Sequence, residues 1–440
     1  MKQKPNIIII TTHDSGRHFG CYGVPTVRTP NIDTLAAEGV KFDNMNAACP
    51  ICSPSRGALL TGQYPQTNGL VGLAGGSGNW ELHDYKVHLS HRLHDLGYTT
   101  GMFGMQHDTV FLDKLGFDKT EAHGVKKDGD DRSATTVAKD VVEFLENYDY
   151  DQPFYAQVGF HETHTVYNFA DCQPDDEKGV WIPPYSKSHF WASWAGILKR
   201  FDGDPSFSRQ HVAELQGSLH EVDNAVGMIT EALGTLGLEE NTLILFNTDH
   251  GPELPGAKWT MYDAGLGIGF IMRWPAGGID GGFVNDWLLC NVDFLPALFD
   301  LIGEDKPSNL QGVSFAEGCI QDKSATASPR KVAFGNWVDG LNFSARTDRF
   351  KLIRNLVPVD STGRKCQPYE LYDLSIDPLE LTDVANEPAY AEDFKEMKSY
   401  LDKHLLDQND PVATQKIVGE NHIAMLADYR QKYEAMFVNQ

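Results

Sequence analysis

A run of β-branched residues near the start of the chain constrains the fold most strongly. Residues 6–12 are NIIIITT, and such an unbroken apolar run is typical of a central parallel strand that is buried on both faces. A predicted helix then begins at Thr29 and Pro30 and ends at Gly39, and the next segment, VKFDNMNA, alternates like a strand. After these come VHLSHRLHDLG, which has a helical period, and YTTGMFG, a predicted strand. This alternation predicts an α/β fold with a large, mostly parallel sheet flanked by helices.

The same alternation continues through the middle of the chain and then stops. ATTVAKDVVEFLEN is a predicted helix, PFYAQVGF a strand, RQHVAELQGSLHEVDNAVGMITEALGTLG a long helix, and NTLILFNTD a strand. A stretch rich in Pro, Gly and aromatic residues, 165–208, is too long for a plain connection, and we expect it to shape the rim of a site. From about residue 331 short strands with turn signals and a helical region after Tyr390 predict a smaller antiparallel sheet. We therefore expect a large α/β domain over 1–330 and an α+β subdomain over 331–440.

The charge of the chain excludes some classes of partner. Lys and Arg total 37 against 61 Asp and Glu, a formal net charge of −24, which argues against nucleic-acid and anionic-membrane binding. The isoleucine run is too short for a signal peptide or a membrane span, so we expect a cytoplasmic protein unless a leader was removed. Seven cysteines, an odd number over a long chain, do not suggest a disulfide framework.

Acidic and histidine side chains follow two of the predicted core strands. His13 and Asp14 come directly after the first strand, and Asp249 and His250 come directly after NTLILFNTD. The carboxyl ends of parallel strands form the site in such sheets, and grouped acidic ligands there indicate a divalent cation. Either aspartate alone could equally cap a loop or a helix, but the occurrence of both after core strands favours a metal site.

The stretch CPICSPSRGALLTG, residues 49–62, contains the candidate nucleophile. Ser53 is a good helix N-cap and Gly62 a good stop, so the pattern predicts a short helix with Cys52 at its amino end. Arg56 lies one turn further, where its guanidinium can fold back over residue 52. A redox dithiol would begin its helix at Cys49, and a zinc site would need a second pair of ligands that the chain lacks. The stretch therefore places a nucleophile, a cation and a helix amino end together.

Several segments, in order, resemble the sulfatase family. CSPSRGALLTG is similar to the signature whose cysteine is oxidised to formylglycine (3-oxoalanine) by a maturation enzyme. PNIIIITTHDSGRHFGCYG, TPNIDTLAAEGVKF, GYTTGMFGMQH, FHETH, TDHGPELPGAKWTMYDAG and ARTDRFKLIRN with ELYDLSIDPLE resemble the other conserved segments of that family. FHETH and PGAKWTMYDAG look most like the branch that contains heparan N-sulfatase (sulfamidase). The resemblance implies an alkaline phosphatase-like fold and hydrolysis of a sulfuric ester or sulfamate bond in a sulfated carbohydrate or small metabolite.

The resemblance also assigns roles to individual residues. Cys52 would be the formylglycine position, whose hydrate is the nucleophile, and Arg56 would be its stabilising cation. His107 would hold a hydroxyl of the hydrate, His164 would protonate the leaving group, and Lys258 would bind the transferring sulfate. These residue types suit the chemistry, since sulfate transfer requires neutralised oxygens and a protonated leaving atom.

Two positions depart from the family pattern. His13 stands where the family usually has an aspartate ligand, beside Asp14, Asp249, His250 and the modified Cys52 as the remaining metal ligands. Met105 stands where the family usually has a lysine. Calcium is the first expectation for the cation, with magnesium or manganese as alternatives because His13 adds a softer nitrogen ligand. The two changes are opposite in charge, so we expect the net electrostatics around the nucleophile to be preserved.

Two other functions are compatible with these motifs. A phosphonate monoester or phosphodiester hydrolase would use the same Cys-x-Pro-Ser-Arg motif, and a catalytically silent relative would bind sulfated glycans without releasing sulfate. The intact nucleophile motif, Arg56, both histidines and Lys258 argue against the silent relative. The expected partners are a sulfated small molecule or glycan and the maturation enzyme, and a homo-oligomer is left open.

Overall fold

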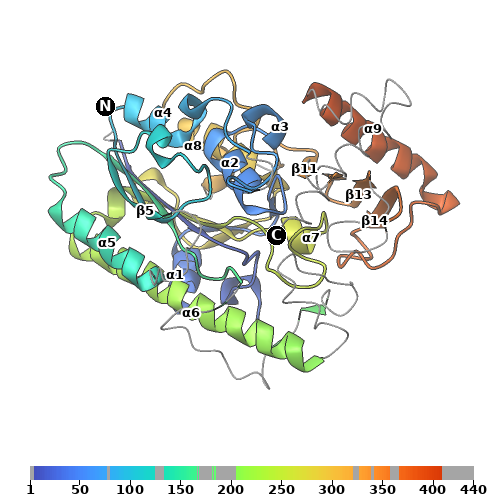
Figure 1. Cartoon of the computed structure of the whole chain (residues 1–440), viewed down its shortest axis with the longest axis horizontal. Helices are drawn as coiled ribbons and strands as arrows, with labels where there is room; N and C mark the ends of the chain where they lie inside the picture. The colour runs from blue at the N-terminus through green and yellow to red at the C-terminus, as the bar shows by residue number, and fades with distance from the viewer. Residues whose placement is uncertain are drawn as a thin grey trace.

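An eight-stranded sheet forms the centre of the molecule (Figure 1). The computed structural model describes residues 4–76, 80–123, 133–165, 167, 181, 183–184, 205–320, 327–337, 341–356 and 366–408. The strand order is β5-β4-β6-β1-β7-β8-β2-β9. The strands are β1 Asn6–Thr12, β2 Val40–Phe42, β4 Thr99–Met105, β5 Lys119–His123, β6 Phe154–Gly159, β7 Thr242–Thr248, β8 Phe270–Arg273 and β9 Phe283–Asn285. The five neighbours from β5 to β7 are parallel, whereas β8 is antiparallel to both β7 and β2, which confirms the predicted mostly parallel α/β sheet.

The isoleucines of β1 pack alternately on the two faces of this sheet, because successive side chains of a strand point to opposite sides. Ile8 and Ile10 belong to the core beneath one layer of helices, and Ile7 and Ile9 to the core beneath the other. The first layer contains α1 (Pro30–Glu38), α5 (Ala134–Asn147) and α6 (Pro205–Thr235), and the second contains α2 (Cys52–Thr61), α4 (Leu89–Asp95) and α8 (Phe294–Ile302). Figure 1 shows these layers below and above the sheet.

The helix that carries the candidate nucleophile begins two residues earlier than predicted. Ile51, in extended conformation, is the N-cap of α2, and Cys52 is its first residue. The prediction that Ser53 caps the helix was therefore wrong, and the Ser53 hydroxyl instead accepts a hydrogen bond from the Ala74 amide at 3.0 Å. Gly62 ends the helix in the left-handed region, with φ of 66°, as predicted.

VKFDNMNA is divided between two sheets. Its first part forms β2 of the large sheet, while β3 (Met45–Asn46) pairs in parallel with β10 (Leu289–Cys290). The split places the backbone of this segment against the end of α7 (Asp263–Leu266), where the Ala47 amide donates to the Leu266 carbonyl and the Ile268 amide donates to the Met45 carbonyl.

The C-terminal region contains the predicted antiparallel sheet, in the order β11-β12-β13-β14. Its strands are β11 Ala333–Trp337, β12 Asn342–Arg346, β13 Phe350–Asn355 and β14 Tyr369–Asp373, and α9 (Ala391–Asp407) covers one face. Trp337, Ile353 and Tyr372 from the other face join the core of the large sheet. A domain boundary at 330/331 stays a prediction. Among the described helices, none combines the length and the hydropathy that a membrane crossing requires.

Candidate active site

Four neighbouring parallel strands deliver the polar side chains of the site. β4, β6, β1 and β7 are consecutive in the sheet, so their carboxyl ends lie at one edge. β1 leads to His13 and Asp14, and β7 leads to Asp249 and His250. β4 leads to His107, and β6 leads to the segment that contains His161 and His164. The sheet therefore collects the predicted metal ligands and both predicted histidines.

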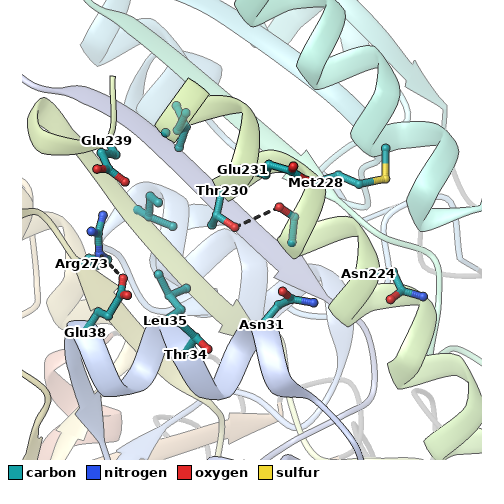
Figure 2. Close-up of a pocket in the computed structure, with 14 residues that line it drawn as sticks. Asn31, Thr34, Leu35, Glu38, Asn224, Met228, Thr230, Glu231, Glu239 and Arg273 are labelled. Carbon is teal, nitrogen blue, oxygen red and sulfur yellow. Dashed lines mark hydrogen bonds and ion pairs between the residues drawn. The ribbon is translucent and has the colours of Figure 1, made fainter. Parts of the chain in front are cut away.

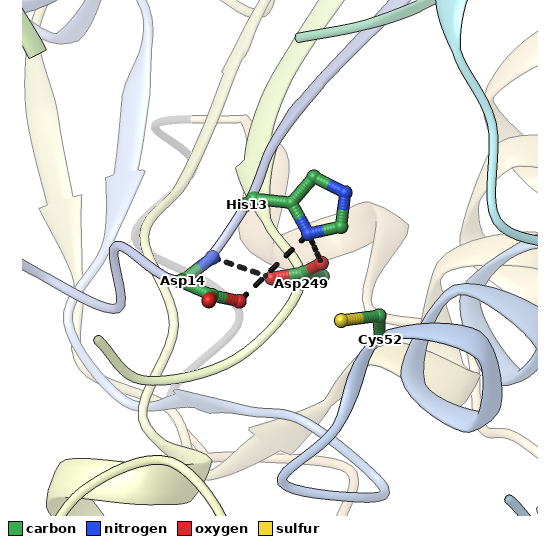
Figure 3. Close-up of side chains that lie close together, drawn as sticks. All are labelled: His13, Asp14, Cys52 and Asp249. Carbon is green, nitrogen blue, oxygen red and sulfur yellow. Dashed lines mark hydrogen bonds and ion pairs between the residues drawn. The ribbon is translucent and has the colours of Figure 1, made fainter. Parts of the chain in front are cut away.

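A buried cluster lies where β1, β7 and the start of α2 meet (Figure 3). One potential ligand atom from each of His13, Asp14, Cys52 and Asp249 lies within 4.8 Å of the others. His13 Nδ1 lies 3.0 Å from Asp249 Oδ2 and 3.7 Å from Asp14 Oδ1. Both His13 Nδ1 and Asp14 Oδ1 are buried without a hydrogen bond. Two carboxylates and an unsatisfied nitrogen, converging away from water, are suited to hold a divalent cation.

His250, the fifth predicted ligand, contacts the same cluster from the side of the nucleophile. Its Nε2 lies 3.2 Å from Asp14 Oδ1 and 3.3 Å from Cys52 Sγ. The Cys52 sulfur occupies the place of an oxygen of the formylglycine hydrate that the sequence predicts. The candidate nucleophile and the candidate cation site are therefore adjacent.

Two basic side chains flank the nucleophile. Lys258 is almost completely buried, and its Nζ lies 2.6 Å from Asp14 Oδ2. Arg56 is also buried, with Nε 3.2 Å from Asp249 Oδ2 and with Nη2 lacking a hydrogen-bond partner. Each cation thus bridges the cluster and the space around Cys52, which is the arrangement that an anionic substrate group requires.

Sequence reasoning missed one acidic residue of the site. Glu253 is buried, its Oε2 lies 3.7 Å from Lys258 Nζ, and it accepts a hydrogen bond from the Thr165 hydroxyl. Its position four residues after Asp249 was the only available signal, because the contacts with Lys258 and Thr165 connect separate segments. Lys258 is consequently held between two carboxylates.

Three further histidines lie near His13 of the cluster. The His13 ring centroid lies 6.3 Å from that of His107, 6.1 Å from that of His161 and 5.3 Å from that of His164. His164 Nδ1 donates to the Thr165 carbonyl at 2.6 Å, which leaves Nε2 as the atom available for proton transfer. His161, three residues before His164, lies beside it, with ring centroids 5.5 Å apart.

The charges of the cluster alter the acidity of its members. Burial and Asp249 raise the pKa of the Cys52 thiol, but Lys258, His13 and His250 together outweigh them and hold that pKa well below its usual value. Burial and Arg56 lower the pKa of His13, but Asp249, Cys52 and Asp14 together outweigh them and raise it to about 10. Burial and Lys258 lower the pKa of His164. The space around residue 52 is thus electropositive.

The two residues that depart from the family pattern contact each other. His13 Nε2 lies 2.9 Å from Met105 Sδ, and both side chains are almost completely buried. A change at either position therefore alters the surroundings of the other.

Two surface pockets differ in their relation to this site. A pocket of about 580 Å³ lies between α1 and α6 (Figure 2), where Arg273 pairs with Glu38 at 3.1 Å, and none of the predicted site residues lines it. A pocket of about 430 Å³ is lined by Ser15, Pro252 and Trp181, among others, and so adjoins the loops of the cluster. Trp181 is half-buried against the core. The other aromatic residues of the predicted rim, Tyr185, Phe190, Trp191 and Trp194, lie outside the described residues.

Comparisons with known proteins agree with this geometry. The sulfatase family model matches residues 5–304, and the model for the C-terminal region of N-sulphoglucosamine sulphohydrolase matches residues 257–408. An ulvan-active sulfatase of Formosa agariphila is 27% identical, covering 92% of this chain and 75% of the relative. Human N-sulphoglucosamine sulphohydrolase is 24% identical, covering 92% of this chain and 91% of the relative.

The fold is shared with solved structures. The crystal structure of a phosphonate monoester hydrolase of Agrobacterium radiobacter has a TM-score of 0.71 at 20% identity, covering 92% of this chain and 95% of that one. This likeness confirms the expected alkaline phosphatase-like architecture and shows the fold alone. Because the sulfatase family model matches most of its length, the chain belongs to the sulfatase family.

Proposed function

We propose that this protein removes sulfate from a sulfated carbohydrate, O-linked or N-linked, with residue 52 as formylglycine and one divalent cation in the cluster. The observation that carries the proposal is the convergence of Lys258, His13 and His250 on Cys52 at the amino end of α2. The names of the relatives support a sulfated sugar, including an N-sulfated one, as the substrate class.

Each residue has a distinct task in this proposal. A formylglycine hydrate would supply the attacking hydroxyl and a second hydroxyl whose deprotonation expels sulfate. Lys258 and Arg56 neutralise the non-bridging oxygens of the sulfate group. His164 gives a proton from Nε2 to the leaving oxygen or nitrogen, and His107 orients a hydroxyl of the nucleophile.

The cation would be held by His13, Asp14, Asp249 and His250, with an oxygen of residue 52. The unsatisfied Asp14 Oδ1 and His13 Nδ1 fit such an ion, which would supply positive charge opposite the sulfate oxygens. Calcium was the first expectation from sequence. Cys52 is only 2% exposed, so we expect the maturation enzyme to act on the chain before it folds.

The test combines two measurements on one preparation. Peptide mass spectrometry across Cys52 should show the aldehyde, and sulfate release should occur from N- or O-sulfated glucosamine, whereas Cys52→Ala should be inactive. Faster turnover of an aryl phosphonate than of any sulfate would instead indicate a phosphonate hydrolase. Tight binding of sulfated glycan without sulfate release, at full conversion of Cys52, would indicate a silent relative.

A further inference from the structure

The cation cluster offers donor atoms of two kinds. Asp14 and Asp249 supply carboxylate oxygens, while His13 and His250 supply imidazole nitrogens. All four side chains are at most 2% exposed, so water does not compete freely for these atoms. The set is therefore not an all-oxygen cage.

Hydrogen bonding determines which nitrogen of His250 is free. Its Nδ1 lies 2.9 Å from the carbonyl oxygen of Gly251, and a carbonyl can only accept, so Nδ1 carries the proton. Nε2 is therefore the nitrogen that could coordinate a cation, and it lies 3.2 Å from Asp14 Oδ1. A hydrogen bond on the far nitrogen is the usual way in which a metal-binding histidine is oriented.

His13 is oriented in the same sense from the opposite side. Its Nε2 faces the Met105 thioether, a weak acceptor, at 2.9 Å. Its Nδ1 faces Asp249 Oδ2 at 3.0 Å but makes no hydrogen bond, and Asp14 Oδ1 is likewise buried and unsatisfied. Two histidine nitrogens and two carboxylates thus lie close together in a buried cluster, an arrangement that a cation stabilises.

We propose that this cluster binds a divalent first-row transition metal, represented by Mn²⁺ and Zn²⁺, in preference to Ca²⁺. Ca²⁺ takes about six to eight ligands, nearly all of them oxygen. Transition metals also bind imidazole nitrogen well, so a mixed set of nitrogen and oxygen ligands favours a transition metal over Ca²⁺. The inference rests on the proposed function, since it concerns the cation of the same site, and it replaces calcium as the expected ion.

Metal affinity, rather than activity, tests the inference. The full chain is prepared as Cys52→Ser, because the thiol itself attracts soft metals, and it is stripped with a chelator. Calorimetry with Mn²⁺, Zn²⁺ and Ca²⁺ should show affinities for the two transition metals at least tenfold higher than for Ca²⁺. Adding His13→Asp, which exchanges nitrogen for oxygen, should move the affinity ratio at least tenfold toward Ca²⁺.

A control variant makes the test specific. His18→Asn removes a buried histidine outside the cluster. It should keep the metal ratio of the parent chain. Circular dichroism confirms that each variant is folded.

The outcomes separate the inference from the proposed function. The inference is overturned if Ca²⁺ binds as tightly as Mn²⁺ and Zn²⁺ or more tightly, or if His13→Asp leaves the ratio of these affinities unchanged. It is also overturned if a folded chain binds no divalent cation. Sulfate release is measured separately on the wild-type enzyme. A transition-metal preference without sulfate release overturns the proposed function alone, whereas sulfate release from a Ca²⁺-selective enzyme overturns the inference alone.

Discussion

His164 is the residue whose role depends most on the leaving group. Its Nδ1 donates to the Thr165 carbonyl, so Nε2 is the atom left for proton transfer. We expect His164→Ala to lower kcat/KM on a sugar sulfate by about 10² to 10⁴-fold, the usual value of a proton donor. The loss on 4-nitrophenyl sulfate should be far smaller, because nitrophenolate leaves without a proton. Steady-state kinetics on both substrates check this, and equal losses would contradict the assigned role.

The contact between His13 and Met105 predicts that their substitutions are coupled. A lysine at 105 would bring an ammonium against the His13 ring, since the Met105 sulfur already lies 2.9 Å from Nε2. We therefore expect Met105→Lys alone to give no large gain in turnover. The double variant with His13→Asp should recover activity beyond the product of the single effects, a coupling of about 1 to 3 kcal/mol. Additive effects in this cycle, or a large gain from Met105→Lys alone, would exclude the compensation.

The sequence predicted those site residues whose relation to one another is visible within a single segment. Cys52 and Arg56 were found because four residues on one helix bring them to the same side. Glu253 was missed because its partners, Thr165 and Lys258, come from other segments and only the folded chain brings them together. Which side chains touch across strands cannot be read from spacing alone.

At the scale of elements, two glycines let β4 and β6 approach each other next to the site. Gly104 has φ of 72°, and a Cβ on Gly159 would lie 1.8 Å from the Met105 carbonyl oxygen. Because that atom is backbone, it cannot move aside as a side chain would. This close approach positions the end of β4, from which His107 extends.

We expect Gly159→Ala to lower the free energy of unfolding by about 3 kcal/mol or more, at the upper end of overpacking costs. Urea denaturation measures this, and kcat should fall in addition because His107 is displaced. Gly234→Ala, in the last turns of α6 with only an ordinary contact at 3.6 Å, is the matched control. It should be neutral or stabilising by up to about 1 kcal/mol. A fully stable Gly159→Ala variant would show that the strands can separate.

Element types were predicted better than element ends. The strand that ends before His13 and the strand that ends before Asp249 were recognised, because buried parallel strands are unbroken apolar runs. The cap of α2 was not, since Ser53 has good capping propensity but its hydroxyl is used by the Ala74 amide, a contact with another loop. Tertiary hydrogen bonds of this kind override local propensity.

At the scale of the whole molecule, the C-terminal sheet shares its core with the catalytic sheet. Sequence predicted its antiparallel strands but not that Trp337 and Tyr372 pack into the core of the large sheet. His404, on α9, lies in a second contact between the C-terminal region and the large α/β part. Its ring stacks on that of Phe334, with ring centroids 3.9 Å apart, and its centroid lies 4.7 Å from that of the Tyr64 ring. Its Nε2 donates to Asn336 Oδ1 at 2.9 Å.

This buried histidine links stability to pH. Burial and the nearby Arg330 lower the pKa of His404 from 6.5 to about 3. Between these values the unfolded chain binds a proton that the folded chain does not, so stability is present above pH 6.5 and is lost as the pH falls toward 3. Compared with His404→Gln, which can keep the hydrogen bond to Asn336 but does not titrate, the wild-type protein should lose up to about 1.4 kcal/mol more of its free energy of unfolding per pH unit over this window.

Urea denaturation at several pH values measures this difference, with His83→Gln at the exposed surface as the control. Parallel pH profiles of wild type and His404→Gln would show that the contact opens and lets His404 protonate without unfolding the chain.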